Sequence, residues 1–141
     1  MYKLALIASL GVLSLLTPLS AMACGKSTDP VDVVQAQDDA YNAHDVDAFA
    51  ACYADDVTIT TLGGKDPAIK GILALKKTYA FLAKVPKAFH VEILQRIVVG
   101  PTVTDHERVI GLPAGKGQPE AVAVYEVRNG KIQNVWFPPS K

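Results

Sequence analysis

Four consecutive strand-like segments occupy the C-terminal part of this 141-residue chain and limit the folds it can adopt. Branched and apolar residues alternate with polar ones over 88–99, 102–111, 120–128 and 131–137. Gly100-Pro101 and Asn129-Gly130 separate neighbouring segments and are typical of tight hairpin turns. Strands joined in this way predict an antiparallel sheet, which needs a second layer to cover its apolar face.

Helical segments that precede the strands supply this second layer. Asp29-Pro30 combines an N-cap residue with a proline at the first helical position, which predicts that a helix begins there. Asp45 caps a second, short helix, and a third is predicted over 71–84. One short strand, 57–62, lies between the second and third helices. We therefore predict an α+β fold, a cone-shaped roll with three N-terminal helices packed on a strongly curved, mostly antiparallel sheet.

The first 23 residues predict a secretory signal peptide. Lys3 provides the positive charge, an apolar run covers 4–19, and Ala21-Met22-Ala23 has the small-x-small pattern of a cleavage site. Pro18 ends the run too early for a transmembrane helix. We expect an exported protein, periplasmic or secreted, with a signal peptide at 1–23, a tether at 24–29 and one domain at 30–141.

The chain has two cysteines, and the sequence leaves their roles open. Cys24 would be the first residue after cleavage, where bacterial lipoproteins carry a lipidated cysteine, although Ala21 replaces the usual leucine. Lipidation of Cys24 is therefore one expectation, and it would make the protein an envelope lipoprotein attached to the membrane. A disulfide with Cys52 is another, which an oxidising compartment would permit. Cys52 alone would pack as a small apolar residue in its helix.

Charge and motifs exclude several functions. The chain carries 14 basic and 14 acidic residues without a basic stripe, so we expect no nucleic-acid partner. The three histidines lack the spacing of metal ligands, and no nucleophile elbow or glycine-rich phosphate loop is present. We expect neither a metal nor an organic cofactor.

The stretch TVTDHERVIG places four ionisable residues in the middle of a predicted strand. If Gly100-Pro101 is a two-residue loop, Arg96 faces Asp105 across the hairpin. The apolar side of the preceding strand includes Ile97, and this side predicts that His106 and Arg108 point into the cone. A three-residue loop or a bulge would reverse the two faces.

Two interpretations of His106 and Arg108 follow from this orientation. In the first, Arg108 binds an anionic group and neutral His106 accepts a proton. In the second, an acidic residue on a helix pairs with Arg108, and His106 is a hydrogen-bonded core residue. An unpaired arginine in an apolar cone would be costly, so both interpretations supply it with a partner.

Several segments together resemble the nuclear transport factor 2-like superfamily, and within it the SnoaL-like and ketosteroid-isomerase-like proteins. The segments, which span 30–137, are AYNAHDVDAFAACYADDVTI, IKGILALKKTYAFL, HVEILQRIVVG, VTDHERV and VYEVRNGKIQNVWF. The resemblance implies a cone-shaped fold that is usually dimeric through its sheet. Its members include isomerases, polyketide cyclases, epoxide hydrolases and non-catalytic binders, so the fold does not determine the function.

The resemblance also identifies positions at which this chain departs from ketosteroid isomerases. The general base falls at Thr61, the tyrosine of the first helix at Gln37, and the second acid at Ala123. We therefore expect 5-ene-3-ketosteroid isomerisation at or near background. Epoxide hydrolases place an arginine and an aspartate two residues apart on an inner strand, whereas His106 and Arg108 keep this spacing without the carboxylate.

These observations lead to a small-molecule-binding domain as the first functional hypothesis. Its ligand would be small and either acidic or enolisable. Any enzyme activity would be that of an isomerase, cyclase or hydrolase of the SnoaL-like type. His106 and Arg108 are the candidate catalytic residues, and the candidate ligand-binding residues are Gln37, Tyr41, Thr61 and Tyr125. The alternative is a non-catalytic interaction or dimerisation module whose cone is filled by its own side chains. In either case we expect a homodimer.

Overall fold

The computed structural model describes residues 24–140, and the predicted signal peptide lies outside this range. Three helices lie in this range, with two strands between the second and the third, and a 3₁₀ turn, η1, follows the third. Their bounds are α1 Pro30–Asn42, α2 Val46–Ala50, α3 Ile72–Tyr79 and η1 Ala80–Lys84. The side chain of Asp29 accepts a hydrogen bond from the Val31 amide, and that of Asp45 accepts one from the Ala48 amide. Both predicted N-caps are confirmed.

Six strands form one sheet in the order β2-β1-β6-β5-β4-β3. Their bounds are β1 Tyr53–Thr61, β2 Ile69–Lys70, β3 His90–Val99, β4 Thr102–Ile110, β5 Glu120–Arg128 and β6 Lys131–Phe137. Only β1 and β6 pair in parallel, and the other four pairings are antiparallel. The predicted strand at 57–62 begins four residues earlier, at Tyr53, and the two-residue strand β2 was not predicted.

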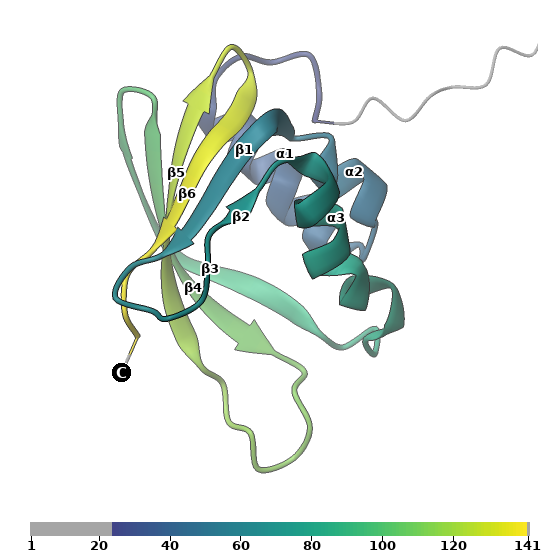
Figure 1. Ribbon diagram of the computed structural model, residues 1–141. Helices are drawn as coiled ribbons and strands as arrows, with labels where there is room; N and C mark the ends of the chain where they lie inside the picture. The colour runs from purple at the N-terminus through teal and green to yellow at the C-terminus, as the bar shows by residue number, and fades with distance from the viewer. Residues whose placement is uncertain (1–23, 141) are drawn as a thin grey trace, which may run out of the picture.

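The sheet is strongly curved and holds the helices on its concave side. In Figure 1 the ends of β3 and β4 sweep beneath the helices, while β1, β5 and β6 form the upright wall beside them. The buried core between these layers includes Val33 and Val34 of α1, Phe49 of α2 and Val103 of β4. The predicted α+β cone is confirmed, and the space between helices and sheet is where a ligand site would lie.

A bulge in β3 reverses the predicted orientation of β4. The strand pairing is the predicted one from Val99, which faces Thr102, as far as Gln95, which faces His106. Beyond that point Leu94 has no partner on β4, and Ile93 pairs with Glu107. A bulge moves the following residues to the opposite face. The apolar residues at the start of β3, before the bulge, therefore share the inner face with Arg96. Ile97, after the bulge, is exposed on the outer face.

The prediction that His106 and Arg108 enter the cone is therefore wrong. Asp105 is fully buried beneath α1, and Glu107 faces the same side. The predicted pair of Arg96 and Asp105 is confirmed, but it lies on the inner face rather than the outer one.

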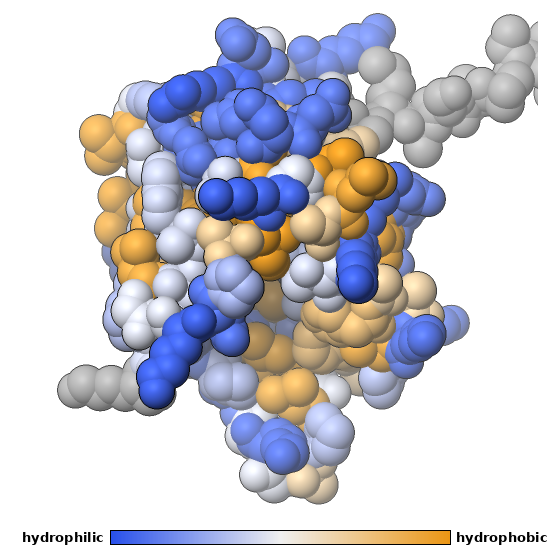
Figure 2. Space-filling view, viewed as in Figure 1, coloured by the Kyte–Doolittle hydropathy of each residue, from blue (hydrophilic) through white to orange (hydrophobic). Residues whose placement is uncertain are grey.

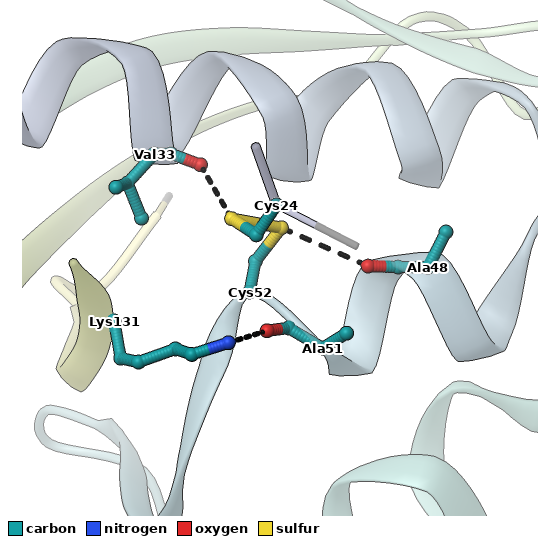
Figure 3. The surroundings of a disulfide bond; sticks show 6 residues. All are labelled: Cys24, Val33, Ala48, Ala51, Cys52 and Lys131. Atoms are coloured by element: carbon teal, nitrogen blue, oxygen red, sulfur yellow. Dashed lines mark hydrogen bonds between the residues drawn. A yellow bond between two sulfur atoms is a disulfide. The ribbon is translucent and has the colours of Figure 1, made fainter. Parts of the chain in front are cut away.

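A disulfide between Cys24 and Cys52 attaches the segment before α1 to the domain (Figure 3). Both cysteines are buried, and Cys24 Sγ lies 3.5 Å from the carbonyl oxygen of Val33 in α1. The ammonium group of Lys131 donates a hydrogen bond to the carbonyl oxygen of Ala51, beside the disulfide. Of the two roles considered for Cys24, the structure has the disulfide.

Candidate functional site

A cavity of about 210 Å³ lies between the helices and the concave face of the sheet. Its lining is mostly aromatic and apolar, with a few polar groups from α1, β4 and β5. The residues are Gln37, Asp38, Tyr41, Phe49, Tyr53, Tyr79, Val91, Glu107, Val109, Ala121, Tyr125 and Phe137. An apolar cavity with a small number of convergent polar groups is the usual form of a small-molecule site.

Four aromatic rings from the three helices and the start of β1 form a continuous wall of the cavity. Phe49 lies at the centre, with ring centroids 5.8 Å from Tyr41, 5.0 Å from Tyr53 and 4.7 Å from Tyr79. Tyr41 and Tyr79 meet nearly edge to face, at 76°. The spacing of α1 places Gln37 and Tyr41 one turn apart, so both side chains reach the cavity.

Glu107 is the carboxyl group that β4 contributes to the cavity. The hydroxyl of Tyr125 donates a hydrogen bond of 2.9 Å to Glu107 Oε1. Burial raises the pKa of Glu107 to about 7, against the lowering effects of this hydrogen bond and of Arg96. A carboxyl group with such a pKa can both give and take a proton near neutral pH.

A second buried carboxyl group, Asp38, belongs to an ionic network at the edge of the cavity. Arg96 Nη2 lies 2.6 Å from Asp38 Oδ2 and 2.7 Å from Asp105 Oδ2, and Arg96 Nε donates to Asp105 Oδ1. Burial and the nearby carboxylates of Asp105 and Glu107 nevertheless raise the pKa of Asp38 to about 7. The hydrogen bonds that Arg96 donates to Asp105 raise the pKa of Arg96 and keep its guanidinium group protonated.

The three carboxyl groups lie close enough to act on one another. Asp38, Asp105 and Glu107 each offer an oxygen within 4.8 Å of the others, which is also a spacing that could hold a metal ion. Arg96 already provides a cation to two of them, and a metal would compete with it for their oxygens. Fully ionised, the cluster has three negative charges against one positive charge.

Gln37 adds a buried polar group whose bonding is incomplete. Its side chain lines the cavity and is 3% exposed. Within residues 24–140, its amide oxygen Oε1 has no hydrogen-bond partner. Buried polar atoms normally have a partner, so this oxygen is a site at which a ligand could donate a hydrogen bond.

The predicted site residues divide between the inside and the outside of the cone. Gln37, Tyr41 and Tyr125 line the cavity, as expected. Thr61 is exposed at the end of β1 and does not contribute to the lining.

His106 and Arg108 share one acidic partner on the outer face. His106 Nε2 lies 2.7 Å from Glu120 Oε2, and Arg108 Nη2 lies 2.8 Å from Glu120 Oε1. An acidic residue pairs with Arg108, as the structural interpretation requires, but it comes from β5 rather than from a helix.

Sequence reasoning missed the two carboxyl groups with the most strongly altered chemistry, Asp38 and Glu107. Asp38 follows Gln37 in α1 and lies at the edge of the apolar stripe, which gave a weak signal. Glu107 was assigned to the outer face because the bulge at Leu94 leaves no mark in the alternation of β3. Tyr79 lies in the third predicted helix, 71–84, and was not named as a site residue.

A larger groove, of about 510 Å³, lies on the surface beside α2, α3 and β1. Its charged residues include Asp55 and Asp56, which are exposed, and Lys76 pairs with Asp47 at the surface. These charged side chains are exposed to solvent, whereas the inner cavity buries Asp38 and Gln37, so the inner cavity is the better candidate site.

Comparison with protein families identifies the domain. A model of the SnoaL-like domain matches residues 34–135, which include both walls of the cavity. The chain belongs to the SnoaL-like family. No curated protein matches the sequence. The resemblance to the nuclear transport factor 2-like superfamily is thereby confirmed.

Solved structures of several other proteins share the fold of this SnoaL-like domain. A cystatin-fold protein of Novosphingobium aromaticivorans shares 28% identity over 77% of this chain and 97% of its own, with a TM-score of 0.65. A polyketide cyclase candidate of Sinorhizobium meliloti shares 19% identity over 75% and 93% of the two chains, with a TM-score of 0.62. An LEH-like epoxide hydrolase of M. tuberculosis shares 21% identity over 81% and 84%, with a TM-score of 0.62. These likenesses establish the fold.

Proposed function

We propose that the cone binds a small enolisable organic molecule and that Glu107 transfers a proton to or from it. The observation that carries this proposal is a carboxyl group with a pKa of about 7 facing an apolar cavity. A general base is most effective when its pKa lies near the working pH. The reaction would be of the isomerase, cyclase or hydrolase type.

The tyrosines would stabilise negative charge that develops on the substrate. Burial and, to a smaller extent, the nearby Glu107 raise the pKa of all four cavity tyrosines. Burial raises the pKa of Tyr79 to about 12, so its hydroxyl keeps its proton at neutral pH. Such hydroxyls can donate hydrogen bonds to an enolate oxygen.

Cavity size and charge narrow the choice of ligand. A volume of about 210 Å³ is below the roughly 300 Å³ at which pockets for drug-sized ligands begin, so a small substrate is favoured over a steroid. The anionic ligand expected from the sequence loses its support, because Arg108 lies outside the cone. The excess of carboxyl groups around the cavity disfavours an anion.

Solvent deuterium exchange tests the proton-transfer function without a known substrate. Acetylacetone and 2-cyclohexenone would be incubated with the protein in D₂O, and exchange at carbon would be followed by proton NMR. We expect the exchange rate to rise with pH through about 7 and to fall by about a hundredfold in Glu107→Gln, the range typical for loss of a general base. Glu120→Gln, on the outer face, should behave as the wild type. An unchanged rate in Glu107→Gln would refute the assignment.

We also propose that the protein is exported. The disulfide supports this, because disulfides persist in oxidising compartments. Within residues 24–140, no helix is long and apolar enough to cross a membrane. Intact-mass measurement on protein produced with its leader should give the 24–141 chain less two hydrogens. The mass of the full chain would contradict export, and a diacylglyceryl adduct would establish the lipoprotein instead.

The interaction hypothesis has its own support on the outer face of the sheet. Ile97, Val99 and Val122 are 54%, 72% and 37% exposed there. Figure 2 shows apolar side chains along the left edge of the molecule, beside the β3–β4 hairpin. We propose that this face joins two copies of the chain, in addition to the cavity function.

A further inference from the structure

We propose that the ligand of the cavity carries a small organic cation, such as an alkylammonium group. This inference rests on the proposal that the cavity is a ligand site and names the class of ligand. It follows from three features of the cavity: its charge, its aromatic wall and the amide oxygen of Gln37, which has no hydrogen-bond partner within residues 24–140.

The charge of the cavity is unbalanced. Arg96 offsets one of the three carboxylates formed by Asp38, Asp105 and Glu107, and no basic residue of the described part of the chain lines the cavity itself. Buried charge without a counter-charge is costly. The free protein can reduce this cost by protonating Asp38 and Glu107, and a cationic ligand would replace those protons.

The aromatic wall suits an organic cation. The rings of Tyr41, Phe49, Tyr53 and Tyr79 pack at differing angles and all contribute to the lining. An ammonium group over such rings is attracted by their electron-rich faces, and this attraction is stronger in a site shielded from water. Glu107 of β4 supplies the negative charge.

The same features favour an organic cation over a metal ion. A metal ion requires several oxygen atoms at about 2.0–2.6 Å, and Arg96 already binds two of the three carboxylates. The cavity is far larger than one ion, and much of its lining is apolar. The buried amide oxygen of Gln37 can accept an N–H or O–H hydrogen bond from the ligand.

Cation binding should release protons. The groups that face Glu107 and Asp38 are Arg96 from β3, Asp105 from β4, Tyr125 from β5, Gln37 and Tyr41 from α1, Tyr53 from β1 and Tyr79 from α3. Among them, the carboxyl groups of Glu107 and Asp38 have a pKa of about 7. A cation beside them favours the ionised forms, so affinity should rise with pH through this range.

Titration calorimetry with two probes of equal shape tests the inference. Choline and 3,3-dimethylbutan-1-ol differ in having a charged nitrogen or a neutral carbon at the same position. We expect choline to bind at least tenfold more tightly at pH 8, and its affinity to fall at least threefold at pH 6. Titration in buffers of different ionisation enthalpy should detect proton release.

Matched variants locate the binding site. Glu107→Gln should remove most of the preference for choline over its neutral analogue, and Tyr79→Leu should weaken choline binding at least threefold. Glu120→Gln should retain wild-type affinity. Circular dichroism and the thermal midpoint establish that each variant is folded.

Three outcomes would overturn the inference. Equal affinity for the two probes would show that charge is not recognised, and no binding of either at millimolar concentration would exclude this ligand class. Binding of Mn²⁺ or Ca²⁺ but not of choline would identify a metal site. Titration calorimetry does not depend on deuterium exchange. Cation binding can therefore fail while proton transfer succeeds, and proton transfer can fail while cation binding succeeds.

Discussion

Glu107 and Asp105 lie two residues apart on one face of β4 and have different partners. Asp105 binds the guanidinium group of Arg96 through both of its carboxylate oxygens. Glu107 has the Tyr125 hydroxyl, a neutral donor that compensates less for burial than a cation does. Glu107 therefore faces the cavity without a cation bound to its carboxylate, and two of our predictions concern these partners.

Replacing Glu107 with glutamine should change how stability depends on pH. Its pKa in the folded protein, about 7, lies above the ordinary 4.5, so the folded state holds the proton more tightly. Stability from this group is fully present below pH 4 and is lost as pH rises to 7. Glu107→Gln should therefore be more stable than the wild type at pH 8, by up to about 3 kcal/mol. Denaturant unfolding at pH 5 and pH 8 checks this; an equal effect at both values would contradict it.

Arg96 and Arg108 provide a matched pair for measuring the buried network. Arg96→Met would leave Asp38 and Asp105 buried without their counter-charge and should cost about 3–5 kcal/mol, measured by denaturant unfolding at pH 8. Arg108→Met removes a partly exposed ion pair with Glu120 and should cost about 0–1 kcal/mol. The reverse order would mean that Arg108 is the structural arginine.

At the scale of elements, the sequence predicted helices and strands better than it predicted faces. Proline, capping residues and hairpin turns determine local conformation, and the four C-terminal strands lie within two residues of their predicted ends. The face of β4 depends on the bulge at Leu94, which is a tertiary feature. Apolar residues occupy odd-numbered positions both before and after the bulge, from Val91 to Val99. The alternation of apolar and polar residues therefore continues through the bulge and gives no sign of it. The site was misplaced for this reason.

The close approach between the start of β3 and the end of β4 depends on Gly111. A Cβ atom at this position would lie 2.1 Å from the carbonyl oxygen of Ala88, and φ is +78°. Gly111→Ala should therefore destabilise the protein by roughly 3 kcal/mol, since backbone must move as well as adopt a strained conformation. Gly100→Ala, with φ of +56° and open space, should cost about 1 kcal/mol. Thermal unfolding compares the two, and equal losses would mean that contact with Ala88 is unimportant.

At the scale of the whole molecule, the curved sheet creates two different surfaces. Its concave face, closed by the helices, holds the carboxyl groups and the aromatic wall. Its convex face exposes apolar residues, and grooves of about 330 and 360 Å³ lie on either side of Val122. The sequence predicted this division in general through the SnoaL-like resemblance, but it assigned His106 to the wrong surface.

The last prediction concerns the dimer proposed through the convex face. We expect sedimentation velocity at about 50 µM to give a dimer, because exposed apolar patches of this kind mark interaction surfaces. Ile97→Asp should convert it to a monomer, since its exposed side chain lies in the groove beside Val122 and a charge there would be buried on association.

Leu73→Asp is the control: Leu73 is 81% exposed on α3, on the helical side of the sheet, and its replacement should leave the dimer intact. A monomeric wild type, or a dimer lost only in Leu73→Asp, would move the interface away from the sheet. Cavity binding should survive Ile97→Asp, because the side chains that line the cavity belong to the opposite face.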